Sequence, residues 1–107
     1  MTDDSLELAA SIIEKDIRKH YSLQELAHMT GINVLDLKTG FKERYGVGPF
    51  HYLSNLRLQR AKQLLTETNN PIRYISSQCG YKSIPSFHSA FKRKFQHPPG
   101  YFRKQTK

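Results

Sequence analysis

The stretch from Asn70 to Phe95 constrains the fold of this chain more than any other part of it. Gly80 divides the stretch into two short segments, and a glycine at such a point readily adopts the positive φ that ends a helix. Asn70 followed by Pro71 is typical of a helix start before the glycine. Ser83 is typical of an N-cap after it. The stretch therefore predicts two short helices joined by a tight turn, a helix-turn-helix.

The second of these helices is predicted to have an aromatic face and a positively charged end. Three aromatic residues recur every four positions, as on the buried face of a helix. They are Phe87, Phe91 and Phe95. Three consecutive cations lie between Phe91 and Phe95 on the same helix, and they are Lys92, Arg93 and Lys94. This helix therefore presents one face to a core and carries positive charge where it ends.

An earlier stretch, from Ser22 to Gly46, repeats this plan. Apolar or small residues precede a glycine at the same spacing in both copies: Leu23, Leu26, Ala27 and Gly31 in the first, and Ile72, Ile75, Ser76 and Gly80 in the second. Ser22 with Glu25 forms the pattern of a capping box, and Asn33 is a good N-cap for the next helix. The copies lie about 50 residues apart, which predicts two related helix-turn-helix units.

The length of 107 residues predicts a single domain. The helix starts, helix ends and apolar spacings along the chain predict an all-α fold of about seven helices. A first helix precedes the repeated units, and a long linker helix joins them. The expected parts are a first helix-turn-helix unit at about 22–46, a linker helix at about 49–68, a second unit at about 70–95 and a C-terminal helix at about 98–104.

Charge is unevenly distributed along the chain. The formal net charge is +8 and the sequence pI is about 9.8. Five of the nine acidic residues fall within residues 1–16, and no acidic residue follows Glu67. A basic body of this kind favours a polyanionic partner, either a nucleic acid or an anionic membrane surface. Such a run of charge is also found on ordinary solvated faces, which is the alternative.

The sequence does not favour an enzyme, a metal site or a cofactor. The five histidines are scattered and form no metal-binding spacing, and no nucleophile or phosphate-loop motif is present. Cys79 is the only cysteine, so it is either a buried small hydrophobe or a reactive thiol, and no internal disulfide can form. No apolar run is long enough to cross a bilayer. We therefore expect a cytoplasmic protein that does not enter a membrane.

Two residues sit in unexpected places within predicted helices. Gly40 lies inside the helix after Asn33, where it costs roughly 1 kcal/mol relative to alanine. It either permits a close approach of another backbone or is neutral. Arg57 falls on the apolar stripe of the linker helix. It is expected to be partly buried and paired with an acid from the first half of the chain, with a phosphate contact as the alternative.

Three groups of residues, in this order, resemble the DNA-binding domain of AraC/XylS-type bacterial transcriptional regulators. They are Arg57-Leu58-x-x-Ala61-x-x-Leu64-Leu65, then Pro71-Ile72-x-x-Ile75-x-x-x-x-Gly80-Tyr81-x-Ser83-x-x-Ser86-Phe87-x-x-x-Phe91-Lys92, then Pro98-x-x-x-Phe102-Arg103. The resemblance covers roughly Ser22 to Lys104. It implies a homeodomain-like fold with two helix-turn-helix units, whose recognition helices enter successive major grooves of promoter DNA. It also implies RNA polymerase as a further partner, and an effector or dimerisation domain outside this chain.

The resemblance assigns base contacts residue by residue. In the first unit the base-reading positions are Leu35, Lys38 and Thr39, and in the second they are Ile84, Pro85, His88 and Ser89. His88 is the ambiguous one, because it is either a DNA contact or simply exposed. The residues best suited to phosphate, by charge or by position at a helix N-terminus, are Ser83, Lys42, Arg44, Lys82, Lys92, Arg93 and Lys94.

This chain departs from the family pattern at two positions near its end. Phe102 stands where the family usually has a tyrosine, so a hydroxyl contact is expected to be missing. Gln96 replaces a common glycine after the second recognition helix, which makes the geometry of that turn an open question. A basic helical module that binds RNA or an anionic membrane surface is the alternative function, and competition with duplex DNA distinguishes the two.

Overall fold

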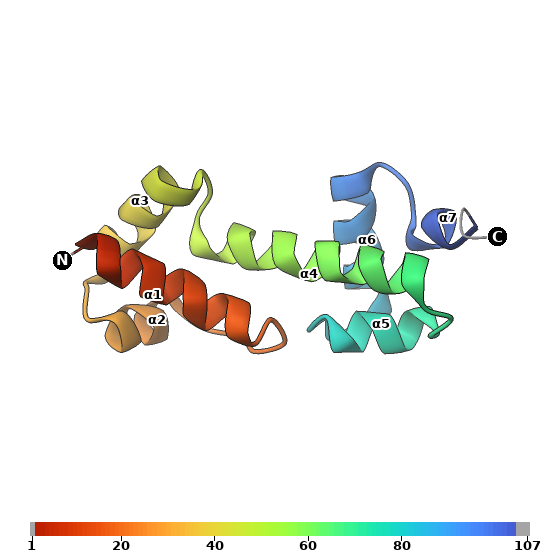
Figure 1. Cartoon of the computed structure of the whole chain (residues 1–107), viewed down its shortest axis with the longest axis horizontal. Helices are drawn as coiled ribbons and strands as arrows, with labels where there is room; N and C mark the ends of the chain where they lie inside the picture. Colours follow the sequence, from red (N-terminus) through yellow and green to blue (C-terminus); the bar gives the residue numbers. More distant parts are fainter. Residues whose placement is uncertain (1, 105–107) are drawn as a thin grey trace. The chain divides into compact units, whose positions relative to one another are not determined.

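The computed structural model of the protein describes residues 2–104, and these form seven helices (Figure 1). The helices are α1 (Thr2–Lys15), α2 (Leu23–Thr30), α3 (Val34–Tyr45), α4 (Pro49–Glu67), α5 (Ile72–Gln78), α6 (Ile84–Phe95) and α7 (Pro99–Lys104). The chain contacts divide into two compact units, Met1–Asn55 and Leu56–Lys107. Helix α4 begins in the first unit and ends in the second. The all-α prediction is confirmed.

The first helix-turn-helix, α2 and α3, is closed by the caps that the sequence predicts. Ser22 Oγ accepts from the Glu25 amide at 3.0 Å, and the Ser22 amide donates to Glu25 Oε1 at 2.9 Å, which completes the capping box. Asn33 Oδ1 accepts from the amide of Asp36 at 2.8 Å. Gly31 ends α2 with φ +79°, a conformation that glycine adopts without a steric cost.

The second helix-turn-helix, α5 and α6, confirms one predicted cap and corrects another. Ser83 caps α6, because its Oγ accepts from the Ser86 amide at 3.2 Å. We expected Asn70 to cap α5, but it does not. Pro71 occupies the N-cap position without a side-chain cap bond, and the Asn70 amide donates to Thr68 Oγ1 at 3.2 Å. The Thr68 hydroxyl therefore fixes the turn between α4 and α5 in place of a side-chain cap.

The core of the first unit lies where α1, α2 and α3 pack against one another (Figure 1). Leu37 and Phe41 of α3 are fully buried. The Phe41 ring lies 4.6 Å from that of Tyr45 and 5.2 Å from that of Tyr52, centroid to centroid. Other buried residues of this unit include Leu6, Ala9, Ala10, Ile13, Leu26, Ala27 and Leu53. An aromatic cluster therefore joins the end of α3 to the beginning of α4.

Gly40 permits a close approach between α3 and α1. A Cβ atom at Gly40 would lie 3.2 Å from Leu6 Cδ1, which is closer than ordinary van der Waals contact. The close neighbour is the side chain of Leu6 and not another backbone, so the close backbone approach that we considered is not what the structure shows. The Leu6 side chain occupies the space that a side chain at Gly40 would need.

The core of the second unit is built around the aromatic stripe of α6. Phe87 and Phe91 are fully buried and Phe95 is partly buried, so the predicted buried face is confirmed. Phe102 joins this core, with its ring centroid 5.6 Å from that of Phe91. The other buried members are Leu58, Ala61, Leu65, Ile75 and Cys79. The phenylalanine at position 102 is therefore used in packing.

Burial of two residues of the second unit, Cys79 and Arg57, bears on the alternatives that the sequence left open for them. Cys79 is fully buried, and this burial raises the pKa of its thiol to about 11, which identifies it as a core residue. Arg57 is also buried, at 8% exposed, and its Cζ lies 5.8 Å from the centre of the Tyr81 ring. Burial lowers the pKa of Arg57. The expected burial of Arg57 is confirmed, and its pairing with an acid stays a prediction.

Candidate nucleic-acid interface

The first recognition helix, α3, presents a continuous exposed face. Leu35 is 68% exposed, and Lys38, Thr39 and Lys42 are exposed as well. These positions are three, four and seven residues apart, so at about 100° per residue they lie on one side of the helix. Thr39 Oγ1 donates to the Leu35 carbonyl at 2.9 Å. The Thr39 hydroxyl is thus held to the helix backbone, while the Lys38 side chain is exposed beside it.

Arg44, which we predicted to contact phosphate, lies on a different side of α3. It follows Leu35 by nine residues, which places it about half a turn away from Leu35. Its Nη2 donates to Glu7 Oε2 of α1 at 2.6 Å. Among the residues that the structure describes, this ion pair joins α1 to the recognition helix. This ion pair could not be predicted from the sequence, because Glu7 and Arg44 are 37 positions apart.

The second recognition helix, α6, exposes the residues that we predicted to contact bases to different extents. Pro85 and Ser89 are exposed, and Ile84 is 38% exposed. His88 is partly buried, with its ring edge-on to that of Phe87 at 6.1 Å. His88 therefore lies where the exposed face meets the aromatic core, and Ile84, Pro85 and Ser89 are the more exposed positions.

The polar and cationic residues around α6 fall into three groups. Lys82 and Ser83 are exposed at its N-terminus, and the Ser83 hydroxyl is used in the cap, where Oγ also donates to Ser86 Oγ at 2.9 Å. Lys92 and Arg93 are exposed along the helix. Lys94 is partly buried, and its Nζ lies 5.6 Å from the centre of the Phe95 ring.

The two recognition helices are matched residue by residue at a separation of 50 positions. Their N-caps are Asn33 and Ser83, and each helix is twelve residues long. Each ends at a residue in the left-handed region, Gly46 with φ +84° and Gln96 with φ +69°. Gln96 adopts this conformation without being a glycine, and its Nε2 donates to the Arg93 carbonyl at 3.1 Å. The question raised by Gln96 is answered, because the turn keeps the same geometry.

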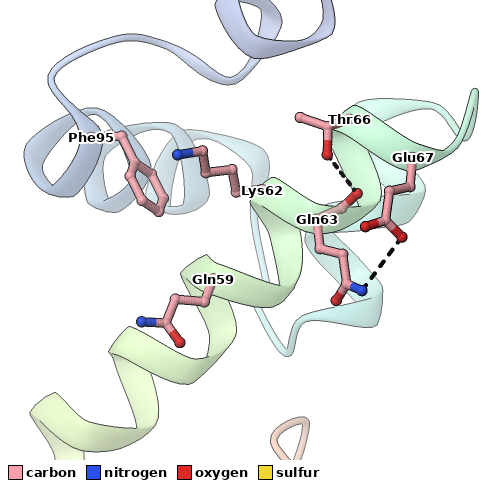
Figure 2. Close-up of a pocket in the computed structure, with 6 residues that line it drawn as sticks. All are labelled: Gln59, Lys62, Gln63, Thr66, Glu67 and Phe95. Atoms are coloured by element: carbon pink, nitrogen blue, oxygen red, sulfur yellow. Dashed lines mark hydrogen bonds between the residues drawn. The ribbon is translucent and has the colours of Figure 1, made fainter. Parts of the chain in front are cut away.

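One open pocket lies within the second unit, between α4 and α6 (Figure 2). Its volume is about 430 Å³, and it is lined by Gln59, Lys62, Gln63, Thr66, Glu67 and Phe95. Lys62 Nζ lies 5.0 Å from the centre of the Phe95 ring, and Gln63 Nε2 donates to Glu67 Oε1 at 3.4 Å. The groups that line the pocket thus interact with one another, and the lining contains no predicted DNA-contact residue.

Other kinds of site find no support within residues 2–104. In this part of the chain no three His, Cys, Asp or Glu side chains come together in a way that would hold a metal ion. Nor does any helix there have the length and apolar character that crossing a bilayer requires. The exposed faces of α3 and α6, with the cations beside them, are the candidate site.

Comparison with known proteins identifies the family. A family model described as a helix-turn-helix domain matches residues 26–105. A solved transcriptional regulator from Chromobacterium violaceum, described as an AraC-type DNA-binding domain-containing protein, is 34% identical, with a TM-score of 0.87 over 97% of this chain and 93% of that one. This chain belongs to the AraC family of helix-turn-helix DNA-binding domains. The family is one of bacterial transcriptional regulators and not of enzymes.

Sequence relatives and a DNA complex extend this comparison. The raffinose operon transcriptional regulatory protein RafR of Pediococcus pentosaceus is 33% identical over 101 residues, which are 94% of this chain and 36% of RafR. The DNA-binding domain of AdpA, solved in complex with a target DNA, shares the fold at a TM-score of 0.87 over 94% of this chain and 90% of that domain, with 18% identity. This AraC-family chain thus spans about a third of the length of RafR.

Proposed function

We propose that this AraC-family chain binds double-stranded promoter DNA with sequence specificity, as the DNA-binding domain of a bacterial transcription regulator. In this proposal α3 and α6 are the recognition helices, and they enter successive major grooves. The observation that carries it is the repetition of one plan: a capped helix, twelve residues long, with an exposed face beside exposed cations, occurs once in each unit. An α-helix is of a size that fits the major groove.

The first unit is proposed to supply most of the hydrogen-bonded readout. Lys38 is the only cation among the proposed base-contacting positions, and a lysine there can donate to guanine N7 or O6. Within residues 4–103, Leu35 is the most exposed large hydrophobic side chain, and it suits contact with a thymine methyl group. Thr39 completes this set, and its methyl group is available while its hydroxyl is bonded to the backbone.

The second unit is proposed to read bases mainly through shape and apolar contact. Its base-contacting positions are Ile84, Pro85, His88 and Ser89. None of them carries the long cationic or amide side chain that is typical of bidentate base contacts. Half-sites read by the two units should therefore differ in sequence, with the stricter base preference under α3.

Phosphate contacts are proposed for the exposed cations and for the N-terminus of α6. These residues are Lys42, Lys82, Ser83, Lys92 and Arg93. We leave Arg44 and Lys94 out of the set, since Arg44 is bonded to Glu7 and Lys94 is partly buried beside Phe95. Contacts to phosphate fix the position of a protein on DNA and carry no base preference of their own.

RNA polymerase and a separate effector or dimerisation domain are proposed as further partners. The support for the separate domain is the length of RafR. This chain corresponds to 36% of RafR, and the remainder of that protein has room for another domain. We further propose that the protein acts in the cytoplasm, where bacterial promoter DNA is found.

The test begins with selection of bound duplexes from random DNA, followed by affinity measurements on single-base variants of the selected site. Lys38→Ala should weaken binding to the preferred site by about 1–3 kcal/mol and relax selection at one or two base pairs. Lys92→Ala, the matched control, should weaken binding to all duplexes alike. The assignment of α3 to base reading is wrong if Lys38→Ala weakens all duplexes equally while Lys92→Ala changes base preference.

Competition separates DNA binding from the alternative function. Structured RNA and anionic vesicles are added to the complex with the selected duplex at physiological salt. Electrostatic attraction alone does not distinguish polyanions. A protein that also reads bases should therefore keep the selected duplex in the presence of both competitors. Displacement by RNA or vesicles at equal phosphate concentration would favour the basic-module alternative.

A further inference from the structure

We propose that Glu7 is a positioning residue for the recognition helix α3, and that it influences base selection through Arg44 without touching DNA. This inference rests on the proposed function, because it takes α3 to be a helix that reads bases. Glu7 lies on α1, and the family match begins only at residue 26. The contribution of Glu7 therefore comes from a helix that lies outside both helix-turn-helix units.

The ion pair between Glu7 and Arg44 holds one end of α3 against α1. Arg44 Nη2 and Glu7 Oε2 are 2.6 Å apart, slightly shorter than the roughly 2.7–2.9 Å that is usual for a charge-assisted hydrogen bond between such groups. The Arg44 guanidinium also lies near the ring of Tyr45, with Cζ 5.6 Å from the ring centre. The guanidinium is thus held by a carboxylate from α1 and by an aromatic ring from its own helix.

A second contact lies next to this ion pair. Leu6 directly precedes Glu7, and its side chain fills the space beside Gly40. Gly40 is four residues before Arg44, which is about one helical turn. Two consecutive residues of α1 therefore contact two positions one turn apart on α3. The apolar contact limits how closely the helices approach, and the ion pair restrains rotation of α3 about its axis.

The restrained side of α3 is opposite to the side proposed to read bases. Arg44 lies about half a turn from Leu35, and Lys38 and Thr39 share the exposed face with Leu35. Because a helix moves largely as a rigid rod, a rotation permitted on the α1 side also displaces the base-reading side chains. Base-edge hydrogen bonds depend strongly on distance and angle, so a small displacement reduces selectivity.

The size of the effect is set by the exposure of the ion pair. The side chains of Arg44 and Glu7 are 41% and 57% exposed, and exposed pairs have modest coupling. We therefore expect a loss of selectivity of about two- to five-fold on breaking the pair, and no loss of folding.

The experiment is a charge exchange in the 107-residue chain, with selectivity as the measured quantity. Selectivity is the ratio of the affinity for the selected duplex to the affinity for duplexes with one base changed under α3. Changes of net charge affect all duplexes alike and cancel in this ratio. Glu7→Arg and Arg44→Glu should each lower the ratio about two- to five-fold, and the double variant should restore it. Bases under α6 should keep their ratios in all three proteins.

Two further variants keep the outcome interpretable. Asp4→Arg is the matched control, because Asp4 is an exposed acid on the same helix and the substitution makes the same charge change as Glu7→Arg. It should raise the affinity for all duplexes and leave the ratio unchanged. Glu7→Gln, which keeps the shape of the side chain, replaces Glu7→Arg if circular dichroism shows that the latter has lost helix.

The inference is overturned if the single variants keep the parental ratio, if the double variant does not restore it, or if Asp4→Arg lowers it equally. Lys38→Ala distinguishes this failure from failure of the proposed function. If Lys38→Ala relaxes base preference while the Glu7 and Arg44 variants do not, the positioning role alone is wrong. If Lys38→Ala also leaves base preference unchanged, the assignment of α3 as a reading helix fails first.

Discussion

Gln96 shows how a single residue can carry a conformational cost inside an otherwise regular turn. Within the part of the chain that the structure describes, Gln96 is the one residue other than glycine that has a positive φ. The left-handed conformation costs roughly 1–2 kcal/mol for a residue with a Cβ atom. The matched position in the first unit, Gly46, has no such cost. The hydrogen bond from Gln96 Nε2 to the Arg93 carbonyl offsets part of it.

Replacement of this residue by glycine is predicted to stabilise the protein. Gln96→Gly should raise the free energy of unfolding by about 1 kcal/mol, because the steric cost is removed while only an exposed hydrogen bond is lost. Urea unfolding followed by circular dichroism measures the difference. The reverse change in the first unit, Gly46→Gln, is the matched control and should destabilise by a similar amount. A Gln96→Gly protein that is less stable than the parent would show that the side-chain bond outweighs the backbone cost.

Replacement by alanine is predicted to change the stability of the protein differently at two glycines inside helices. An added Cβ at Gly100 of α7 meets nothing within 4 Å, whereas at Gly40 it meets Leu6 at 3.2 Å. Gly100→Ala should therefore stabilise by about 0.5–1 kcal/mol through helix propensity alone. Gly40→Ala should give no such gain, and Gly40→Leu should destabilise by about 1–3 kcal/mol. Thermal unfolding of the three variants tests this, and an equal gain at both glycines would rule out a tight contact at Gly40.

At the scale of whole elements, a hydrogen bond links α1 to the beginning of α4. The Tyr52 hydroxyl donates to Glu14 Oε2, and this bond raises the pKa of Tyr52 to about 12, with burial and the carboxylate charge adding to the shift. A tyrosine in an unfolded chain has a pKa of about 10. The bond therefore stabilises the fold fully below about pH 10, and this stabilisation is lost as the pH rises toward 12.

Removal of the carboxylate is predicted to change this alkaline behaviour. In Glu14→Gln the pKa of Tyr52 should fall toward 10, since its main cause is gone. An ultraviolet titration of tyrosine ionisation should then show one group titrating at lower pH than in the parent, and Tyr52→Phe identifies that group. The free energy of unfolding should also fall less steeply above about pH 9 in Glu14→Gln. A titration curve that is the same in Glu14→Gln as in the parent would contradict the assignment.

The elements that could be predicted from the sequence are those fixed by local chemistry. Ser22, Asn33 and Ser83 are caps because their side chains reach amides three residues later, and this depends on neighbouring residues alone. The buried stripe of α6 follows from helical spacing in the same way. Local sequence also placed the two units about 50 residues apart.

The details that could not be predicted depend on residues distant in the chain or on competition between neighbours. Asn70 is a good N-cap by type, but the Thr68 hydroxyl engages its amide, and Pro71 takes the N-cap position. Arg44 looks like any other cation of α3 until α1 is placed beside it. The assignment of bases and phosphates to particular side chains stays a prediction, because these contacts depend on how DNA lies against the protein.

On the scale of the whole molecule, the uneven charge predicts that DNA binding depends steeply on salt. Four of the proposed phosphate contacts are cationic side chains, namely Lys42, Lys82, Lys92 and Arg93. Each neutralised phosphate contributes about −0.9 to the slope of log K against log salt concentration, so a slope of about −4 or steeper is expected. Titrations at several salt concentrations measure it, and Lys92→Ala should reduce the slope by about one. A slope shallower than about −2 would mean that these cations do not face DNA.

The matched positions continue past the recognition helices and give the domain a modular character. Pro49 begins α4 and Pro99 begins α7, both prolines are buried, and each follows its left-handed residue by three positions. Helix α7 thus corresponds to the first turns of α4, the helix that leads from one reading unit into the next. An engineered chain in which α7 is lengthened and followed by a copy of α5 and α6 would carry a third reading unit. The repeat therefore offers a route to artificial regulators with longer target sites.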